Sequence, residues 1–360
     1  MNRWLLMSSL GLGGVVVLAA ASVCFTSGCS TMGYYAQSVS GHLALVRAAK
    51  PVPEWLNDDA TSPALKERLG LSQRIRDFAV SSLREPDNAS YRRYADLKRG
   101  AAVWNVVAAP ELSLKLQTWC FPVVGCVGYR GYFDRAEAEA FAAEQRAQGL
   151  EANVYPVPAY STLGALPGDW LADPLLSTFI HFPEGELARL IFHELAHQVA
   201  YAGGDTVFNE SFATAVERIG GQRWLAERAS AAARAEYAEF EGRRRDFREL
   251  TRSYRDRLAA LYAGAAADAD KRAAKAALMQ RLQADYAELK RERWGGYAGY
   301  DGWFARANNP GFGVLSAYSE LVADFDRLFE REGRDLARFY AAVHRLAALP
   351  KAARRAALAP

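Results

Sequence analysis

Length, composition and charge limit what this chain can be. At 360 residues, of which 51% are hydrophobic, it is long enough to bury a large core, and its composition is that of a globular protein. Forty-four basic residues face 41 acidic ones, a formal net charge of +3. Basic and acidic residues are thus nearly equal in number, which gives no support to a nucleic-acid partner. Partners must instead be inferred from candidate functional sites.

The N-terminus has the layout of a secretory signal. Arg3 precedes an apolar run over residues 4–23, and the small residues 26–28 then lead to Cys29. We therefore predict a signal peptide over residues 1–28. A membrane-spanning anchor is the alternative, because a span needs about 20 apolar residues and this run is close to that length.

Segment 26–29, Thr-Ser-Gly-Cys, resembles a lipobox, although Thr26 stands where Leu is usual. The resemblance implies that the signal is removed before Cys29 and that the thiol carries a lipid, which would attach the chain to a membrane. Ser30 follows the cysteine where Asp would signal retention. It therefore implies the periplasmic face of the bacterial outer membrane.

Two further cysteines, Cys120 and Cys126, lie close together in the sequence. Export to an oxidising compartment favours a disulfide between them, and Pro122 and Gly125 would let the short loop turn back. Two buried free thiols are the alternative.

Hydrophobic periodicity predicts helices and short strands before residue 183. Apolar residues at helical spacing predict helices, whereas β-branched and aromatic runs bounded by Gly and Pro predict strands. In chain order we predict helices at residues 64–83 and 91–98, strands at 104–110 and 127–133, a helix at 135–148 closed by Gly149, and strands at 152–157 and 177–182.

Segment 193–197, His-Glu-Leu-Ala-His, carries the sharpest chemical signal. Apolar residues at helical spacing surround it, which predicts a helix that starts near Pro183. His193 and His197, four positions apart, then project from one face and can share one tetrahedral Zn²⁺ per chain. Glu194 lies beside that face and can act as catalytic base toward water without being a ligand.

A catalytic zinc needs a third protein ligand, and Glu210 is the best candidate. The two glycines at 203–204 predict a reversal of the chain, and Asp205 can cap a second helix that brings Glu210 back to the metal. Asn209 and Glu217 are candidates to hydrogen-bond a ligand side chain, Glu217 from the same helical face as Glu210. For Glu217 the alternative is an ordinary surface glutamate.

Beyond residue 221 the sequence is almost wholly helical. We predict long helices at 223–261, 268–293 and 314–349, and a Gly- and Tyr-rich loop at 295–313. We divide the chain into a signal peptide (1–28), an N-terminal α+β region with the disulfide loop (29–180), the zinc-binding helices (181–221) and a helical C-terminal region (222–360). We expect the last three regions to form one compact catalytic unit.

Peptide hydrolysis also needs a donor to the oxyanion of the tetrahedral intermediate. Tyr318 is the candidate catalytic donor, and Asn308 and Asn309 are candidate substrate contacts. Their alternative is a role in ordering the loop or packing the core.

Many segments together resemble one family, the predicted aminopeptidases among bacterial lipoproteins. The resemblance extends over residues 28–325. It includes segments 90–94, 119–122, 125–126, 129–133, 159–164, 192–198 and 209–213, and the spacing from 308–309 to Tyr318. Pro310 departs from the family, which usually has Ala there. The resemblance implies removal of N-terminal residues from a peptide substrate, a specificity that the residues alone do not provide.

Segment 209–213 with Glu217 is also similar to the second zinc helix of the gluzincin aminopeptidases, in which a Glu is the third ligand. The spacing from segment 193–197 is shorter here, and the Gly-Ala-Met-Glu-Asn segment that grips the substrate amine is absent.

We therefore expect a mostly helical α+β fold of the zincin type, with a small mixed sheet and long C-terminal helices. The expected function is zinc-dependent peptide hydrolysis by an aminopeptidase. A cell-envelope zinc endopeptidase and a non-enzymatic lipoprotein with a structural zinc remain alternatives. Glu194 argues against the last, because a structural site needs no base beside the metal. No oligomeric state is predicted.

Overall fold

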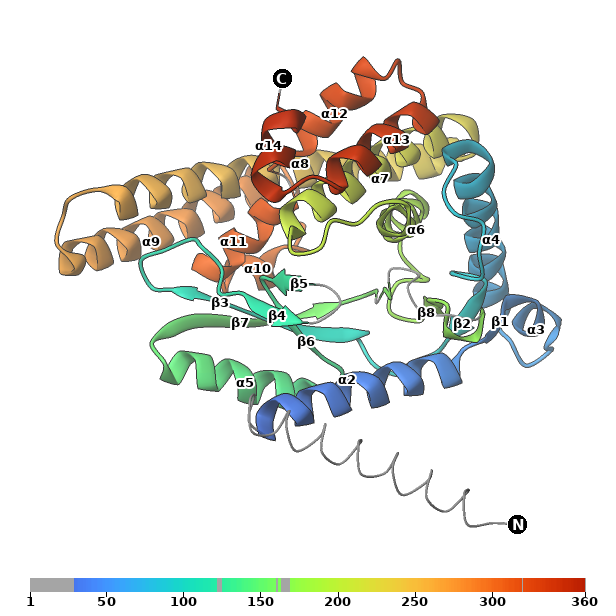
Figure 1. Cartoon of the computed structure of the whole chain (residues 1–360), viewed down its shortest axis with the longest axis horizontal. Helices are drawn as coiled ribbons and strands as arrows, with labels where there is room; N and C mark the ends of the chain where they lie inside the picture. The colour runs from blue at the N-terminus through green and yellow to red at the C-terminus, as the bar shows by residue number, and fades with distance from the viewer. Residues whose placement is uncertain (1–28, 122–124, 160, 163–168, 319, 360) are drawn as a thin grey trace, which may run out of the picture.

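The structure, a computed structural model, describes residues 29–359 except 122–124, 160, 163–168 and 319. The predicted signal peptide, residues 1–28, lies outside the described residues. Helices make up most of the described chain, and its strands form small sheets, one of them mixed (Figure 1). The prediction of a mostly helical α+β fold with a small mixed sheet is therefore confirmed.

The helices are α2 (Cys29–Ala48), α3 (Val52–Asn57), α4 (Pro63–Leu83), α5 (Arg135–Ala147), α6 (Glu184–Val199), α7 (Thr206–Glu227), α8 (Ala231–Ala263), α9 (Asp268–Glu292), α10 (Asp301–Phe304), α11 (Asn309–Ala317), α12 (Val322–Arg331), α13 (Leu336–Ala347) and α14 (Lys351–Leu358). The strands are β1 (Lys50–Pro51), β2 (Arg93–Ala95), β3 (Val103–Pro110), β4 (Trp119–Phe121), β5 (Gly125–Val127), β6 (Arg130–Tyr132), β7 (Leu150–Val157) and β8 (Leu175–Leu176), with a short 3-10 helix, η1 (Asp169–Leu171), before β8.

The two longest strands, β3 and β7, belong to an antiparallel sheet in the order β6-β3-β7. Asp134 caps α5, and Gly149, with a φ of 82°, lets the chain turn from this helix into β7. In Figure 1, α2 and α5 run along one side of this sheet and α11 lies on the other. The strands predicted at 104–110 and 152–157 and the helix at 135–148 are thus confirmed.

A second sheet is mixed, because β2 pairs antiparallel with β1 and parallel with β8. The helix predicted at 91–98 is therefore wrong. Tyr94 faces Lys50 on one side and Leu175 on the other, and this pairing of distant segments outweighs the local helical pattern.

The strand predicted at 177–182 is also wrong. Strand β8 ends at Leu176, and the amides of Phe179 and Ile180 donate back to the Leu176 carbonyl, which makes this segment a turn. Both side chains are fully buried. A short buried turn and a buried strand share the same apolar pattern, so periodicity does not separate them.

Two further predicted segments are divided. The strand predicted at 127–133 falls into the end of β5 and all of β6, which belong to different sheets. The loop predicted at 295–313 contains α10 and the start of α11, where the Asn308 side chain accepts from the Gly311 amide and caps the helix.

The helices predicted at 223–261 and 314–349 are likewise interrupted. Helix α7 continues to Glu227, and α8 begins after Ser230, whose side chain accepts from the Ala233 amide. Segment 314–349 holds the end of α11, then α12 and α13. Helices α8 and α9 pack as a long antiparallel pair that extends from one side of the molecule (Figure 1).

Helices α6 and α7 approach each other closely because of two glycines on α7. A Cβ on Gly220 would lie 2.6 Å from Leu83 Cδ1 and 2.8 Å from Phe192 Cδ2, and one on Gly221 would lie 2.9 Å from Arg189 Cγ. The main hydrophobic core surrounds this contact, with side chains from α4, α6, α7, α12 and α13. The glycines therefore let side chains on the two helices meet.

Candidate metal centre

Helix α6 carries both candidate histidine ligands. It follows Pro183, and the acidic Glu184 and Glu186 in its first turn favour a helix start there. Because His193 and His197 are four residues apart, their rings share one face, with ring centroids 4.9 Å apart.

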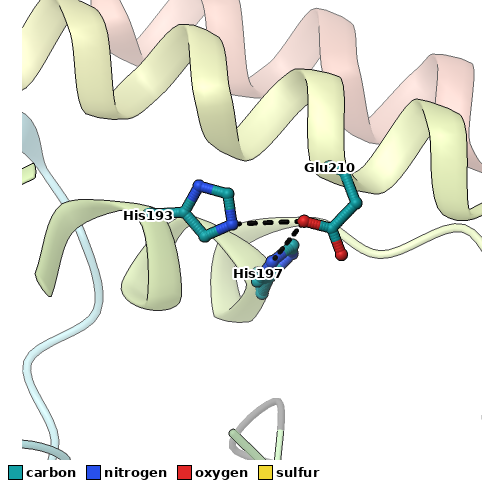
Figure 2. A group of neighbouring side chains, drawn as sticks. All are labelled: His193, His197 and Glu210. Carbon is teal, nitrogen blue, oxygen red and sulfur yellow. Dashed lines mark hydrogen bonds and ion pairs between the residues drawn. The ribbon is translucent and has the colours of Figure 1, made fainter. Parts of the chain in front are cut away.

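Glu210 reaches the two rings from α7, as Figure 2 shows. The Asp205 side chain accepts from the Phe208 amide and caps α7, as predicted. Glu210 Oε2 lies 3.2 Å from His193 Nε2 and 3.7 Å from His197 Nε2. One donor atom of each of the three residues lies within 4.8 Å of the other two, so the group could hold a metal ion.

Asn209 braces the turn between α6 and α7. Its Oδ1 accepts from the Ala202 amide at 2.8 Å, and its Nδ2 donates to the Ala202 carbonyl at 2.9 Å. The side chain is thus bound to the backbone of the turn that precedes Glu210, instead of to an imidazole as expected.

Glu217 contacts the first histidine directly. Its Oε2 lies 3.0 Å from His193 Nδ1, and its Oε1 accepts from Arg189. Glu217 is therefore a partner of His193, not an ordinary surface glutamate. With Nδ1–H donating to Glu217, Nε2 is the nitrogen that faces Glu210, and it can serve as a metal ligand once it has lost its proton.

Burial and charge shift the pKa values of the group in opposite directions. Burial opposes protonation of His193, but its hydrogen bonds to Glu210 and Glu217 raise its pKa well above the ordinary value. Burial lowers the pKa of His197 to about 4. Burial would raise the pKa of Glu210, but the two histidines hold it below its usual range. Positive charge is therefore stabilised on His193, at the place where a cation would bind.

Glu194 follows His193 on α6 and is partly buried. Burial raises its pKa to about 7, although the nearby His193 acts to lower it. A carboxyl group with a pKa near neutrality can both accept and return a proton at physiological pH.

Tyr318, at the end of α11, lies over the candidate ligands. Its ring stacks on that of His193, with centroids 6.1 Å apart and an interplanar angle of 23°, and 40% of the residue is exposed. The charge of Glu210, followed by burial, raises the pKa of Tyr318 well above its ordinary value. The phenol therefore keeps its proton and can donate a hydrogen bond.

Three tyrosines near the site were missed by sequence reasoning. Burial, with the charge of Glu210 adding to it, raises the pKa of Tyr129, Tyr155 and Tyr201, which come from three different segments. Tyr129 lies in segment 129–133, which the family resemblance includes, but no local pattern marks Tyr155 or Tyr201.

Asn308 and Asn309 are engaged in packing contacts. The Asn308 side chain exchanges two hydrogen bonds with Asn153, at 2.6 and 2.8 Å. Asn309 is fully buried, donates to the Pro110 carbonyl at 3.0 Å and accepts from the Tyr262 hydroxyl at 2.7 Å. These bonds hold α11 against β3 and β7, as the alternative of a packing role predicts.

Cys120 and Cys126 form the predicted disulfide, which joins β4 to β5, so the alternative of free thiols is wrong. The β4–β5 hairpin lies against the turn between α6 and α7. A Cβ on Gly125 would be 2.6 Å from the Gly204 amide nitrogen, and both glycines have a positive φ. The hairpin therefore supports the turn that leads to Glu210.

Cys29, the predicted lipidation site, is the first residue of α2. In the part of the chain that the structure describes, no helix combines the length and the apolar character that crossing a membrane requires.

A family model described as "Putative aminopeptidase" matches residues 33–358. No curated protein and no solved structure matches the chain.

Proposed function

The chain belongs to this aminopeptidase family, and on that premise we propose that it is a zinc-dependent aminopeptidase of the zincin type. The observation that carries the proposal is the convergence of His193, His197 and Glu210, with donor atoms within 4.8 Å of one another. Two imidazoles and one carboxylate are a typical ligand set for a catalytic zinc, which keeps its fourth position open. Zinc is favoured because such nitrogen and oxygen donors suit it.

A zinc ion held by these residues would polarise the peptide carbonyl and acidify the attacking water. Glu194 accepts the proton of that water, because its pKa near 7 suits a general base, and then donates it to the leaving amine. Tyr318 keeps its phenolic proton and donates a hydrogen bond to the oxyanion that develops on the carbonyl oxygen.

The preference for peptides with a free N-terminus rests on the family. An aminopeptidase needs acidic groups that bind the substrate ammonium. An endopeptidase with the same centre would use the same groups on the scissile bond. The two activities differ only in whether a blocked N-terminus is accepted.

The test compares the full-length protein, purified in detergent, with Glu194→Gln. Zinc content and hydrolysis are measured on the same peptides in free and N-acetylated form. As a matched control, Glu184→Gln changes a glutamate at the far end of α6 whose side chain accepts from Trp224. We expect one zinc per chain in all three proteins, cleavage of free peptides only, and loss of activity in Glu194→Gln alone.

Other outcomes would redirect the proposal. Cleavage of the blocked peptides would make the protein an endopeptidase. If the protein bound zinc but hydrolysed no peptide, the zinc would be structural. Full activity of Glu194→Gln would overturn the proposed role of Glu194 as general base.

We further propose that Cys29 carries a lipid that holds the chain on the periplasmic face of the outer membrane. The support is the signal-like segment 1–28 and the small residues before the cysteine. Labelling with a radioactive fatty acid in a Gram-negative host should mark the wild type and not Cys29→Ser. Equal labelling of both proteins, or none in either, would rule out this anchor.

A further inference from the structure

A charged side chain that was not among the predicted site residues lies behind the proposed metal centre. Arg189 is on α6, four residues before His193, and its side chain is only 8% exposed. Its Nη2 donates to Glu217 Oε1, and its Nη1 lies 3.2 Å from both Glu241 Oε2 and the Tyr237 hydroxyl. Arg189 therefore links Glu217 on α7 to two residues of α8.

Glu217 uses its two oxygens for two different partners. Oε2 contacts His193 Nδ1 at 3.0 Å, and Oε1 accepts from Arg189. A carboxylate held at both oxygens cannot rotate freely, so the orientation of Glu217 depends on Arg189 as much as on His193. Arg189 is also held in place, because its planar guanidinium is engaged from α7 and α8 together.

Two glycines make room for this arrangement. A Cβ on Gly221 of α7 would lie 2.9 Å from Arg189 Cγ, and a Cβ on Gly185 of α6 would lie 2.5 Å from Tyr237 Cδ2. A larger residue at either position would push Arg189 or Tyr237 away. The local packing is therefore built around these two side chains.

We propose that Arg189 is a positioning residue of the metal centre, an inference that rests on the proposed zinc site. Arg189 holds Glu217, and Glu217 holds the His193 ring so that Nε2 faces the metal. Tyr237 and Glu241 hold Arg189 from α8. The long charged helix α8 thereby contributes residues that help to position the metal ligands.

The physical reason is that the Glu217 side chain, only 15% exposed, is largely shielded from water between helices. Without Arg189, its Oε1 would lose its cationic donor in a place with little water, and the carboxylate would turn away from His193. The ring would then lose the hydrogen bond that sets its orientation. Removing such outer partners of metal ligands typically weakens metal binding about 10- to 100-fold.

The test measures zinc affinity, by competition with a chelator, on the full-length protein and on Arg189→Lys. Lysine keeps the charge but cannot donate to three partners at once in the planar geometry of arginine. The matched control is Arg218→Lys, since Arg218 follows Glu217 on α7 and donates to Asp326 Oδ2 at 2.9 Å but contacts neither histidine in the described structure. We expect about tenfold weaker zinc binding for Arg189→Lys. Arg218→Lys should keep its zinc affinity within about twofold of that of the wild type.

A double-mutant cycle separates positioning from general stability. If Arg189 acts through Glu217, then Arg189→Lys will change zinc affinity little when Glu217→Gln is already present. If the losses of zinc affinity caused by Arg189→Lys and Glu217→Gln were fully additive in the double variant, the proposal would be overturned. Unchanged zinc affinity in Arg189→Lys would overturn it as well. A wild type that binds zinc but hydrolyses no peptide would overturn the proposed enzyme and leave this result standing. A wild type that binds no zinc would overturn both.

Discussion

Glu217 Oε2 lies 3.0 Å from His193 Nδ1, on the opposite side of the ring from the Nε2 atom that faces Glu210. One imidazole is thus held between two carboxylates from α7, seven residues apart. One of these belongs to the candidate ligand set and the other sets the orientation of the ring.

This contact predicts that Glu217→Ala binds zinc about 10- to 100-fold more weakly than the wild type. Glu217→Gln should lose less, because the amide oxygen can still accept from His193 Nδ1–H. Chelator competition measures both values, with the exposed Glu227→Ala at the end of the same helix as control. Equal affinity in Glu217→Ala and the control would contradict the assigned role.

Zinc binding should release a proton. Despite burial, the hydrogen bonds to Glu210 and Glu217 raise the pKa of His193 well above its ordinary value, which favours the protonated ring in the metal-free protein. The ion and the proton compete for Nε2, and affinity should rise about tenfold per pH unit for one released proton. Titration calorimetry in buffers of different ionisation enthalpy measures the release. An enthalpy that does not depend on the buffer would refute it.

Tyr318→Phe should slow catalysis without loss of metal. The ring would still stack on His193, but the phenolic donor would be gone, and loss of one oxyanion donor costs about 10²- to 10³-fold in kcat. Zinc content and KM should stay close to those of the wild type. A drop in zinc content that matches the drop in rate would instead make Tyr318 a support for His193.

Gly220→Ala should destabilise the fold, although alanine favours helices. The new Cβ would lie 2.6 Å from Leu83 Cδ1, and overpacking of this kind costs about 1–3 kcal/mol. Gly242→Ala on α8 is the matched control, because its Cβ would have no described atom within 4 Å. It should stabilise the protein by about 0.5–1 kcal/mol. Urea unfolding of the two variants should therefore give changes of opposite sign.

Asp173 should make stability depend on pH in mildly acidic solution. It is 1% exposed, and burial raises its pKa from 3.8 to about 6, although it accepts from the Thr162 amide and the Ser161 hydroxyl. Between pH 4 and pH 6 the folded chain keeps a proton that the unfolded chain has lost, so this contribution to stability disappears as the pH rises.

Asp173→Asn removes that titration. Across this range the free energy of unfolding of the wild type should fall by about 2–3 kcal/mol relative to the variant, as urea unfolding at pH 4, 5 and 6 would measure. Parallel curves for the two proteins would contradict the assignment.

The sequence alone was sufficient to predict the parts of the candidate site that depend on local structure. Helical spacing places His193 and His197 on one face of α6, and the cap at Asp205 starts the helix that returns Glu210. The disulfide between Cys120 and Cys126 was predicted from their proximity in a chain that we expect to be exported, and the structure contains it. Each of these depends on residues close in the sequence, where propensity and capping decide the conformation.

Only the tertiary structure decided the features that join distant segments. Tyr94 lies in a strand because Lys50 and Leu175 pair with it, although its own neighbours favour a helix. Arg189 reaches Glu217 and α8 because the glycines of α6 and α7 allow close packing. The periodicity of a segment indicates which of its faces is buried but not which residues pack against that face. Those contacts set the surroundings of the candidate metal centre.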